Sequence, residues 1–116
     1  MSLRTEYPFT LPKGFVDQEG TLHRKGVMRL ATARDELEPL RDPRVQGNEA
    51  FATVIVLAKV VTSLGSLRRI DTDVIDGLFV GDFNYLQDVY RTINFEDPSA
   101  LVEAEPGAPL DQAGAR

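Results

Sequence analysis

Residues 48–64, NEAFATVIVLAKVVTSL, form the densest apolar stretch of the chain, and they decide how the rest must be arranged. Many of these residues are β-branched, which favours a strand. The stretch is nevertheless far longer than a usual strand of about 5–6 residues. Asn48 is a good helix N-cap, and Gly65 is typical of the residue just past a helix end. We therefore expect one helix over 48–64.

The apolar residues of this expected helix cover more than one face. The main stripe has helical spacing, while Val56 and Val60 fall outside it; its members are Phe51, Val54, Ile55, Ala58 and Val61. A helix that is apolar nearly all round must be covered nearly all round. The cover comes either from the rest of this domain or from another protein, and the sequence leaves both open.

Composition narrows the class of protein. The chain has 116 residues, of which 42% are hydrophobic and 27% charged, as in one soluble globular domain. Its net charge of −5 argues against nucleic-acid binding. The absence of cysteine excludes disulfides and thiolate zinc sites, and it fits a cytoplasmic location. We expect no signal peptide and no membrane span, because Lys59 interrupts an apolar run that is already short.

The N-terminal part predicts a small antiparallel hairpin. A turn at 17–20 separates two apolar strands, and 12–14 predicts another turn before it. In the second strand, over 21–31, alternation places Leu22 and Met28 on the core side and His23 on the solvent side. Gly26 interrupts this strand and predicts a bulge.

Three helical pieces are expected around the hairpin and central helix. Thr32 caps a short helix over 33–37 that Pro39 ends, although this segment is also compatible with a longer strand. A connection follows over 40–47, a loop spans 65–71, and Thr72 caps a second short helix. A break near residues 80–81 precedes the last helix, which begins at Asp82; its apolar stripe is Phe79, Phe83, Leu86, Tyr90 and Ile93.

The expected fold is an α+β domain: a small antiparallel β-hairpin or meander followed by a helical part with a central apolar helix. We expect a flexible N-terminus over 1–6, the domain over 7–95, and a disordered tail over 96–116. The tail prediction rests on its content of proline, glycine and glutamate without aromatic residues.

No catalytic, cofactor-binding or metal-binding set is expected. His23, the only histidine, has no second histidine or cysteine with which to build a triad or a zinc site, and we interpret it as a solvated surface residue. Three aspartates at 71, 73 and 76 lack the spacing of a calcium loop, and we interpret them as capping and solubilising residues, with a divalent-metal site as the alternative.

The order of elements resembles a family of small tail assembly proteins from contractile-tailed phages and phage-like contractile injection systems. The resemblance covers residues 8–95 and includes the segments FTLPKGFVDQEGTLHRKG, AFATVIVLAKVVTSLGSL and IDTDVIDGLFVGDFNYLQDVYRTIN. Short phrases that carry it are Thr21-Leu22-His23, Leu40-Arg41-Asp42-Pro43 and Asp82-Phe83-Asn84-Tyr85-Leu86. The last of these is similar to the family's recurring element of aspartate, an aromatic residue and a leucine.

This resemblance implies assembly without catalysis. Family members are thought to act as chaperones that keep the tape-measure protein soluble and help tail-tube protein gather on it. It implies protein partners, with no nucleic acid, membrane or cofactor, and it allows a homo-oligomer. The alternative is a structural or baseplate-associated subunit of the same apparatus; a small metal-dependent enzyme is less compatible with the sequence. The residues expected to contact a partner are Val56, Lys59, Val60, Arg68, Arg69 and Tyr85.

Overall fold

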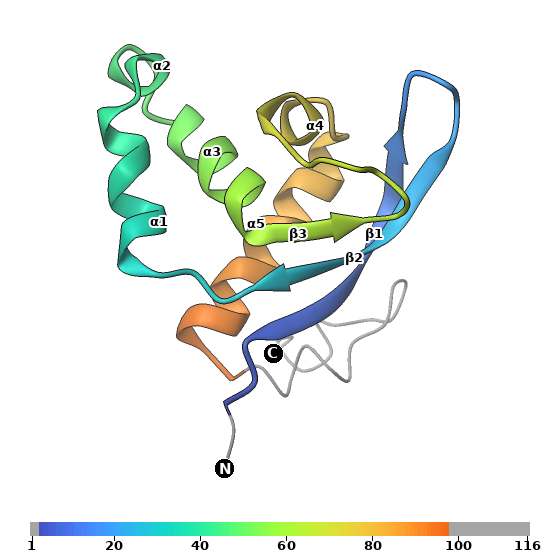
Figure 1. Ribbon diagram of the computed structural model, residues 1–116, viewed down its shortest axis with the longest axis horizontal. Helices are drawn as coiled ribbons and strands as arrows, with labels where there is room; N and C mark the ends of the chain where they lie inside the picture. The colour runs from blue at the N-terminus through green and yellow to red at the C-terminus, as the bar shows by residue number, and fades with distance from the viewer. Residues whose placement is uncertain (1–2, 98–116) are drawn as a thin grey trace, which may run out of the picture.

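A three-stranded antiparallel sheet and several helices make up the protein, which confirms the α+β class (Figure 1). The computed structural model describes residues 3–97. Strands β1 (Glu6–Val16), β2 (Leu22–Arg29) and β3 (Val61–Leu64) lie in the order β1-β2-β3. The predicted hairpin is the β1-β2 pair, and its turn lies at 17–20 as expected.

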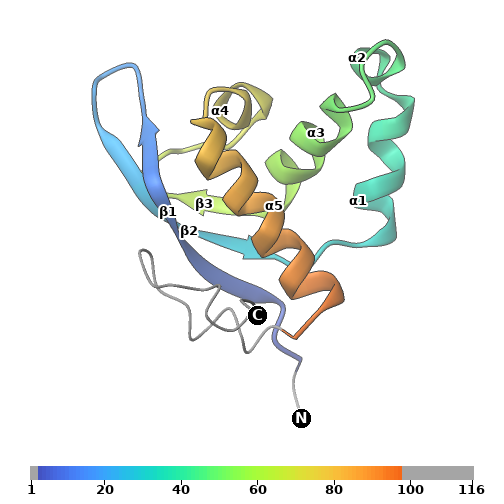
Figure 2. The same ribbon diagram turned by 180° about the vertical axis from the view of Figure 1, so that it is seen from behind.

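The helices lie on one side of the sheet. They are α1 (Ala33–Leu37), the 3-10 helix η1 (Glu38–Arg41), α2 (Pro43–Gln46), α3 (Phe51–Val60), α4 (Thr72–Asp76) and α5 (Val80–Phe95). Helix α5 runs across the sheet beside α3 (Figure 2). Among residues 3–97, no helix is long and apolar enough to cross a membrane. The expected tail lies outside the described residues from 98 onward.

The central helix is shorter than predicted. Helix α3 ends at Val60, and the next four residues form β3, which pairs with β2. Here the strand preference of β-branched Val61 and Thr62 prevails because β2 offers a ladder of hydrogen bonds. Gly65, with φ of 57°, turns the chain after this strand and not after a helix. The N-cap is Ala50, without a side-chain bond, so Asn48 is not the cap.

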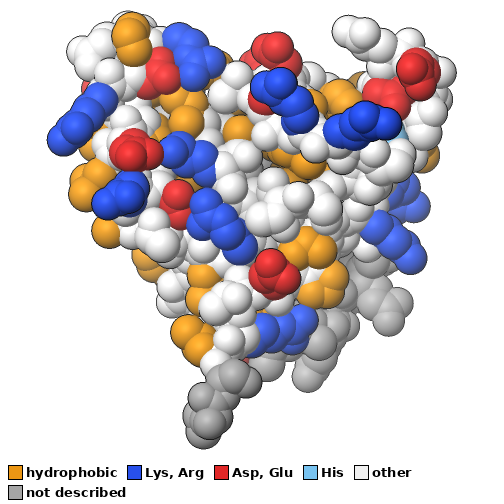
Figure 3. Space-filling view, viewed as in Figure 1, with side chains coloured by type: hydrophobic (Ala, Val, Ile, Leu, Met, Phe, Trp, Pro, Cys, Tyr) orange, Lys and Arg blue, Asp and Glu red, His pale blue; other side chains and the backbone are white. Residues whose placement is uncertain are grey.

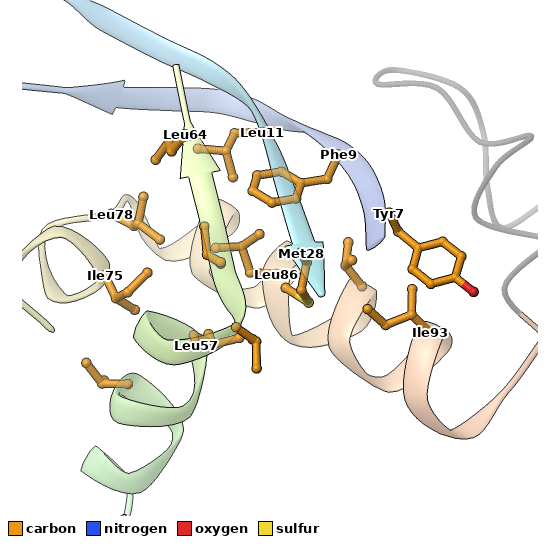
Figure 4. Packing of buried hydrophobic residues seen from close by; sticks show 14 residues of the cluster. Tyr7, Phe9, Leu11, Met28, Leu57, Leu64, Ile75, Leu78, Leu86 and Ile93 are labelled. Atoms are coloured by element: carbon orange, nitrogen blue, oxygen red, sulfur yellow. The ribbon is translucent and has the colours of Figure 1, made fainter. Parts of the chain in front are cut away.

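The hydrophobic core lies between the sheet and helices α3, α4 and α5 (Figure 4). The sheet contributes Phe9, Leu11 and Met28, which are all buried. The helices and the break before α5 face them with a second set of buried side chains, namely Leu57, Val60, Ile75, Leu78, Leu86, Val89 and Ile93. Apolar burial of this kind is the main favourable term in folding, and it holds α3 and α5 on the same face of the sheet.

Residues 12–14 form an irregular part of β1, and the turn predicted there is wrong. The β1-β2 register shifts between Thr10 and Phe15, as in a bulge. The backbone N–H groups of Lys13 and Gly14 point away from β2. They donate to the two carboxylate oxygens of Asp82, at 2.9 and 2.8 Å. Asp82 of α5 thus accepts backbone hydrogen bonds that the carbonyl groups of a neighbouring strand would otherwise accept.

Helix α5 also covers the free edge of β1. Thr10 donates its backbone N–H to the hydroxyl of Tyr85 at 3.3 Å. Alternate residues of an antiparallel strand face the free edge, so Pro8 shares that edge with Thr10. Pro8 has no N–H to donate, and neither has Pro12 in the irregular part of the strand. The free edge of β1 therefore offers few unpaired donors.

Arg29 joins β2 to α1 and α3. Its guanidinium makes a two-point ion pair with Asp35, at 2.7 and 3.1 Å, and donates to the carbonyl of Lys59 at 3.2 Å. Asp35 also completes a capping box with Thr32, which confirms the predicted short helix. The Arg29 guanidinium holds the pKa of Asp35 well below its ordinary value. Pro39 does not end the helical path, because η1 continues it.

Three other boundaries differ from the expectations. The predicted connection over 40–47 contains α2, which Asp42 caps by accepting from the N–H of Arg44. Asp71, one residue before Thr72, caps α4. The break before the last helix falls over 77–79, so α5 begins at Val80 and places Asp82 in its first turn. A carboxylate there is favoured by the helix dipole.

We predict that Asp82→Ala lowers the free energy of unfolding by about 2–4 kcal/mol, because it leaves two backbone donors of β1 without a partner. Chemical denaturation measures the loss. Asp88→Ala, on the exposed side of the same helix, is the control and should change stability by less than about 1 kcal/mol. Equal effects of the two substitutions contradict the proposed role of Asp82.

We also predict an acid-sensitive contribution from Asp35. Because folding lowers its pKa, the stabilisation is present above the ordinary carboxyl pKa near 3.8 and is lost as the pH falls below that value. Denaturation at a series of pH values from about 6 to 2 should show a smaller loss of stability in Asp35→Asn than in the wild type. Parallel pH profiles for the two proteins contradict this assignment.

Candidate functional site

An open groove lies between helices α3 and α5. It consists of two adjoining hollows of about 430 and 380 Å³, which meet at Thr53 and Gln87. The first is lined mainly by Ala52, Val56, Leu57, Tyr90 and Phe95, and Glu36 of α1 and Arg91 stand at its side. The second is lined by Asn48, Ala50, Phe51, Val54, Ile75, Asp76, Leu78, Val80 and Phe83. We call the two together the α3–α5 groove.

Two faces of helix α5 contact different parts of the molecule. One face packs under the sheet through Asp82, Leu86, Val89 and Ile93, which are all buried. The other lines the groove with residues at helical spacing, namely Val80, Phe83, Gln87 and Tyr90. The apolar stripe predicted for this helix mixes the two faces: Leu86 and Ile93 belong to the core, while Phe83 and Tyr90 line the groove.

Exposed apolar side chains stand at both ends of the groove. Val80 is 74% exposed at one end, and Phe95 is 69% exposed at the other. They are the first and last residues of α5, so the groove follows the helix for about 22 Å at 1.5 Å per residue. Apolar surface that is gathered and exposed in this way is typical of protein interaction sites.

Tyr90 connects α5 to α1 at the end of the groove near Phe95. Its hydroxyl donates to a carboxylate oxygen of Glu36. Burial, followed by this hydrogen bond to Glu36, raises the pKa of Tyr90 well above its ordinary value. The ring of Tyr90 also meets that of Phe95 edge to face, with 6.3 Å between centroids. These contacts hold this end of the groove in shape.

The three residues of the central helix that we expect to contact a partner lie in different surroundings. Val56 is half-buried and lines the groove, as a partner-binding residue should. Val60 is 0% exposed and packs in the core, so its predicted contact with a partner is wrong for this fold. Lys59 makes an ion pair with Glu38 at 2.8 Å and is not part of the groove lining. Figure 3 shows positive and negative side chains alternating over the side of the molecule where α1 and α3 lie.

The remaining predicted contact residues lie away from the groove. Arg68 and Arg69 are exposed in the loop over 65–71, with Arg69 3.9 Å from Asp71. Tyr85 sits beside β1, where its ring contacts Phe9 edge to face at 6.5 Å between centroids. Burial raises the pKa of Tyr85. Tyr85 therefore has a structural role in attaching α5 to the sheet.

His23 is buried, with 3% of its surface exposed, so the solvated interpretation is wrong. Beyond the irregular part of β1, the loop after β3 covers this side of the hairpin. Ser66 donates its backbone N–H to Nδ1 of His23 at 3.2 Å, which places the proton of the neutral ring on Nε2. Nε2 lies 2.8 Å from Asp17 and donates to it, and this bond lowers the pKa of Asp17.

These bonds leave His23 without a free ring nitrogen for proton transfer. The space beside it also explains Gly65, since a Cβ there would stand 2.2 Å from Nδ1. Asp71 caps α4; it is one of the three aspartates that we interpret from the sequence as capping and solubilising residues. Within residues 3–97, no three histidine or acidic side chains stand close enough together to hold a metal ion.

Comparison of the chain with protein-family models, with curated protein sequences and with solved structures finds no significant match. The resemblance to tail assembly proteins therefore rests on the sequence patterns alone.

Sequence reasoning missed several groove residues. Phe95 was placed at the end of the ordered pattern, and Gln87 was not singled out. A signal was present in Val80, Phe83, Gln87 and Tyr90, which repeat at spacings of 3, 4 and 3 beside the core stripe. Without the position of α3, this second stripe could not be told from the edge of the first.

We predict that an aspartate affects stability very differently at two valines one helical turn apart. Val60→Asp places a carboxylate in the core and should lower the free energy of unfolding by about 4 kcal/mol or more. Val56→Asp opens onto the groove and should cost less than about 1.5 kcal/mol, because the charge stays in contact with water. Thermal unfolding followed by circular dichroism distinguishes them. A Val56→Asp protein that fails to fold contradicts the placement of Val56 on an open groove.

Proposed function

We propose that this protein is a non-enzymatic assembly factor that holds an amphipathic helix of a partner protein in the α3–α5 groove. One observation carries the proposal: most side chains that line the groove are apolar, and it ends in exposed Val80 and Phe95. A helix laid in such a groove buries one apolar face against it, with anchors spaced three or four residues apart.

The shape of the groove favours a helix over a small molecule. A small-molecule site is concave and encloses most of its ligand, with a few polar groups converging on it. The α3–α5 groove is instead long and open, and Thr53 and Gln87 are the uncharged polar side chains near its middle. About four turns of helix match its length of roughly 22 Å.

The partner class follows from the sequence resemblance. We propose that the client is the tape-measure or tail-tube protein of a phage-type contractile tail or injection system. A long helix-rich client exposes apolar stripes before assembly, and covering one of them in the groove would keep it soluble. The acidic surface of the factor, with its net charge of −5, would add solubility to the complex.

The test is co-expression of the full chain with the tape-measure protein of a contractile system from the same genome. Val80→Ser together with Phe95→Ser removes both exposed anchors without adding charge and should weaken co-purification by about 100-fold or more. Leu22→Ser together with Leu37→Ser removes exposed apolar side chains elsewhere and should leave co-purification unchanged.

Two results argue against this proposal. The first is a groove double variant that keeps the client soluble as well as the wild type does. The second is the protein in finished particles at fixed stoichiometry, which identifies a structural subunit instead of a factor that leaves after assembly.

A further inference from the structure

Charges around the groove are predominantly negative. The charged side chains that line it are Glu36, Asp76 and Arg91. Arg91 is already paired with two carboxylates, those of Asp88 and Glu96, and the second pair spans 3.4 Å. The charged side chains of the lining, counted together with these two partners of Arg91, are four carboxylates and one guanidinium, with a net charge of −3.

The two acidic side chains of the lining belong to different hollows, Asp76 to the one that contains Val80 and Glu36 to the one that contains Phe95. Glu96 pairs with Arg91, which lines the same hollow as Glu36. Asp76 is the last residue of α4, where the helix dipole disfavours a carboxylate. The local stability of α4 therefore does not explain its charge.

We propose that the groove is selective for a basic amphipathic helix, one whose apolar face is bordered by lysine or arginine. This inference rests on the proposed function, since it describes the helix that the groove would bind. Lysine and arginine side chains are long enough to reach carboxylates beside an apolar contact while keeping their heads in water. Such pairs at the border speed association and select partners more than they add affinity.

Charge disfavours two other occupants. The segment 98–116 of this chain carries Glu103, Glu105 and Asp111 against a single Arg116. It would bring like charge to an acidic border. A second copy of the chain meets the same difficulty, because each copy has a net charge of −5. A basic partner helix is the occupant that complements both the apolar floor and the acidic border.

Two synthetic peptides of about 16 residues test the selectivity. Both place leucines along one helical face; one borders them with lysine and the other with glutamate. Fluorescence anisotropy with the full wild-type chain should show the lysine peptide binding about tenfold more tightly or better at about 50 mM salt. This preference should shrink at about 300 mM salt, because the charges at the border are exposed.

A matched pair of charge reversals locates the effect. Asp76→Lys lies at the groove, whereas Glu19→Lys lies in the exposed turn between β1 and β2, and each changes the net charge by the same amount. Asp76→Lys should reduce binding of the lysine peptide several-fold, and Glu19→Lys should leave it nearly unchanged. Equal effects of the two reversals would mean that net charge alone governs binding, which overturns the inference.

The outcomes separate this inference from the proposed function. If both peptides bind equally and the Val80→Ser, Phe95→Ser variant binds neither, the groove binds helices without the charge preference, and only the present inference fails. The inference also fails if the glutamate peptide binds more tightly or if neither peptide binds. In the last case, co-expression with the tape-measure protein decides the proposed function independently.

Discussion

The carboxylate of Asp82 is the interaction on which the helical side of the molecule depends. It is 0% exposed, and it accepts two backbone hydrogen bonds from the irregular part of β1. A buried carboxylate is costly unless such bonds compensate for its lost hydration. Because both donors lie in neighbouring residues of one strand, the first turn of α5 can sit at one place along that strand only. The packing of Leu86, Val89 and Ile93 under the sheet then sets the direction of the rest of α5.

That direction creates the groove. Once Leu86, Val89 and Ile93 pack under the sheet, the adjacent stripe of α5 is turned towards α3 but does not reach it along its whole length. The apolar surplus noted in residues 48–64 is thereby divided: Leu57 and Val60 complete the core, and Val56 lines the groove.

Local signals in the sequence predicted local structure well. The β1-β2 hairpin and the helix cap at Thr32 depend on residues close together in the chain, and both are present. Strand β3 could not be predicted in the same way, because Val61–Leu64 is compatible with a helix until β2 lies beside it. The burial of His23 depends on a loop more than 40 residues away, and alternation along a strand does not show which side such a loop covers.

The candidate site was only partly predictable for a related reason. Val56 was expected at a partner-binding face and does line the groove, but Val60, one turn later, is buried in the core. A helical wheel assigns both to one side; the packing of α5 divides them. Likewise, the aromatic side chain of Tyr85 suggested a contact surface, whereas its hydroxyl is occupied by the N–H of Thr10.

The occupied edge of β1 has a consequence for how the sheet can associate with other chains. An open strand edge can recruit another strand and begin a fibre. In β1, prolines at 8 and 12 lack the donor that a new strand needs, and the bonds from Thr10, Lys13 and Gly14 are already used. Pairing of another strand with this edge is thus suppressed, in part by the carboxylate of Asp82. The sheet therefore resists becoming a template for further copies along this edge.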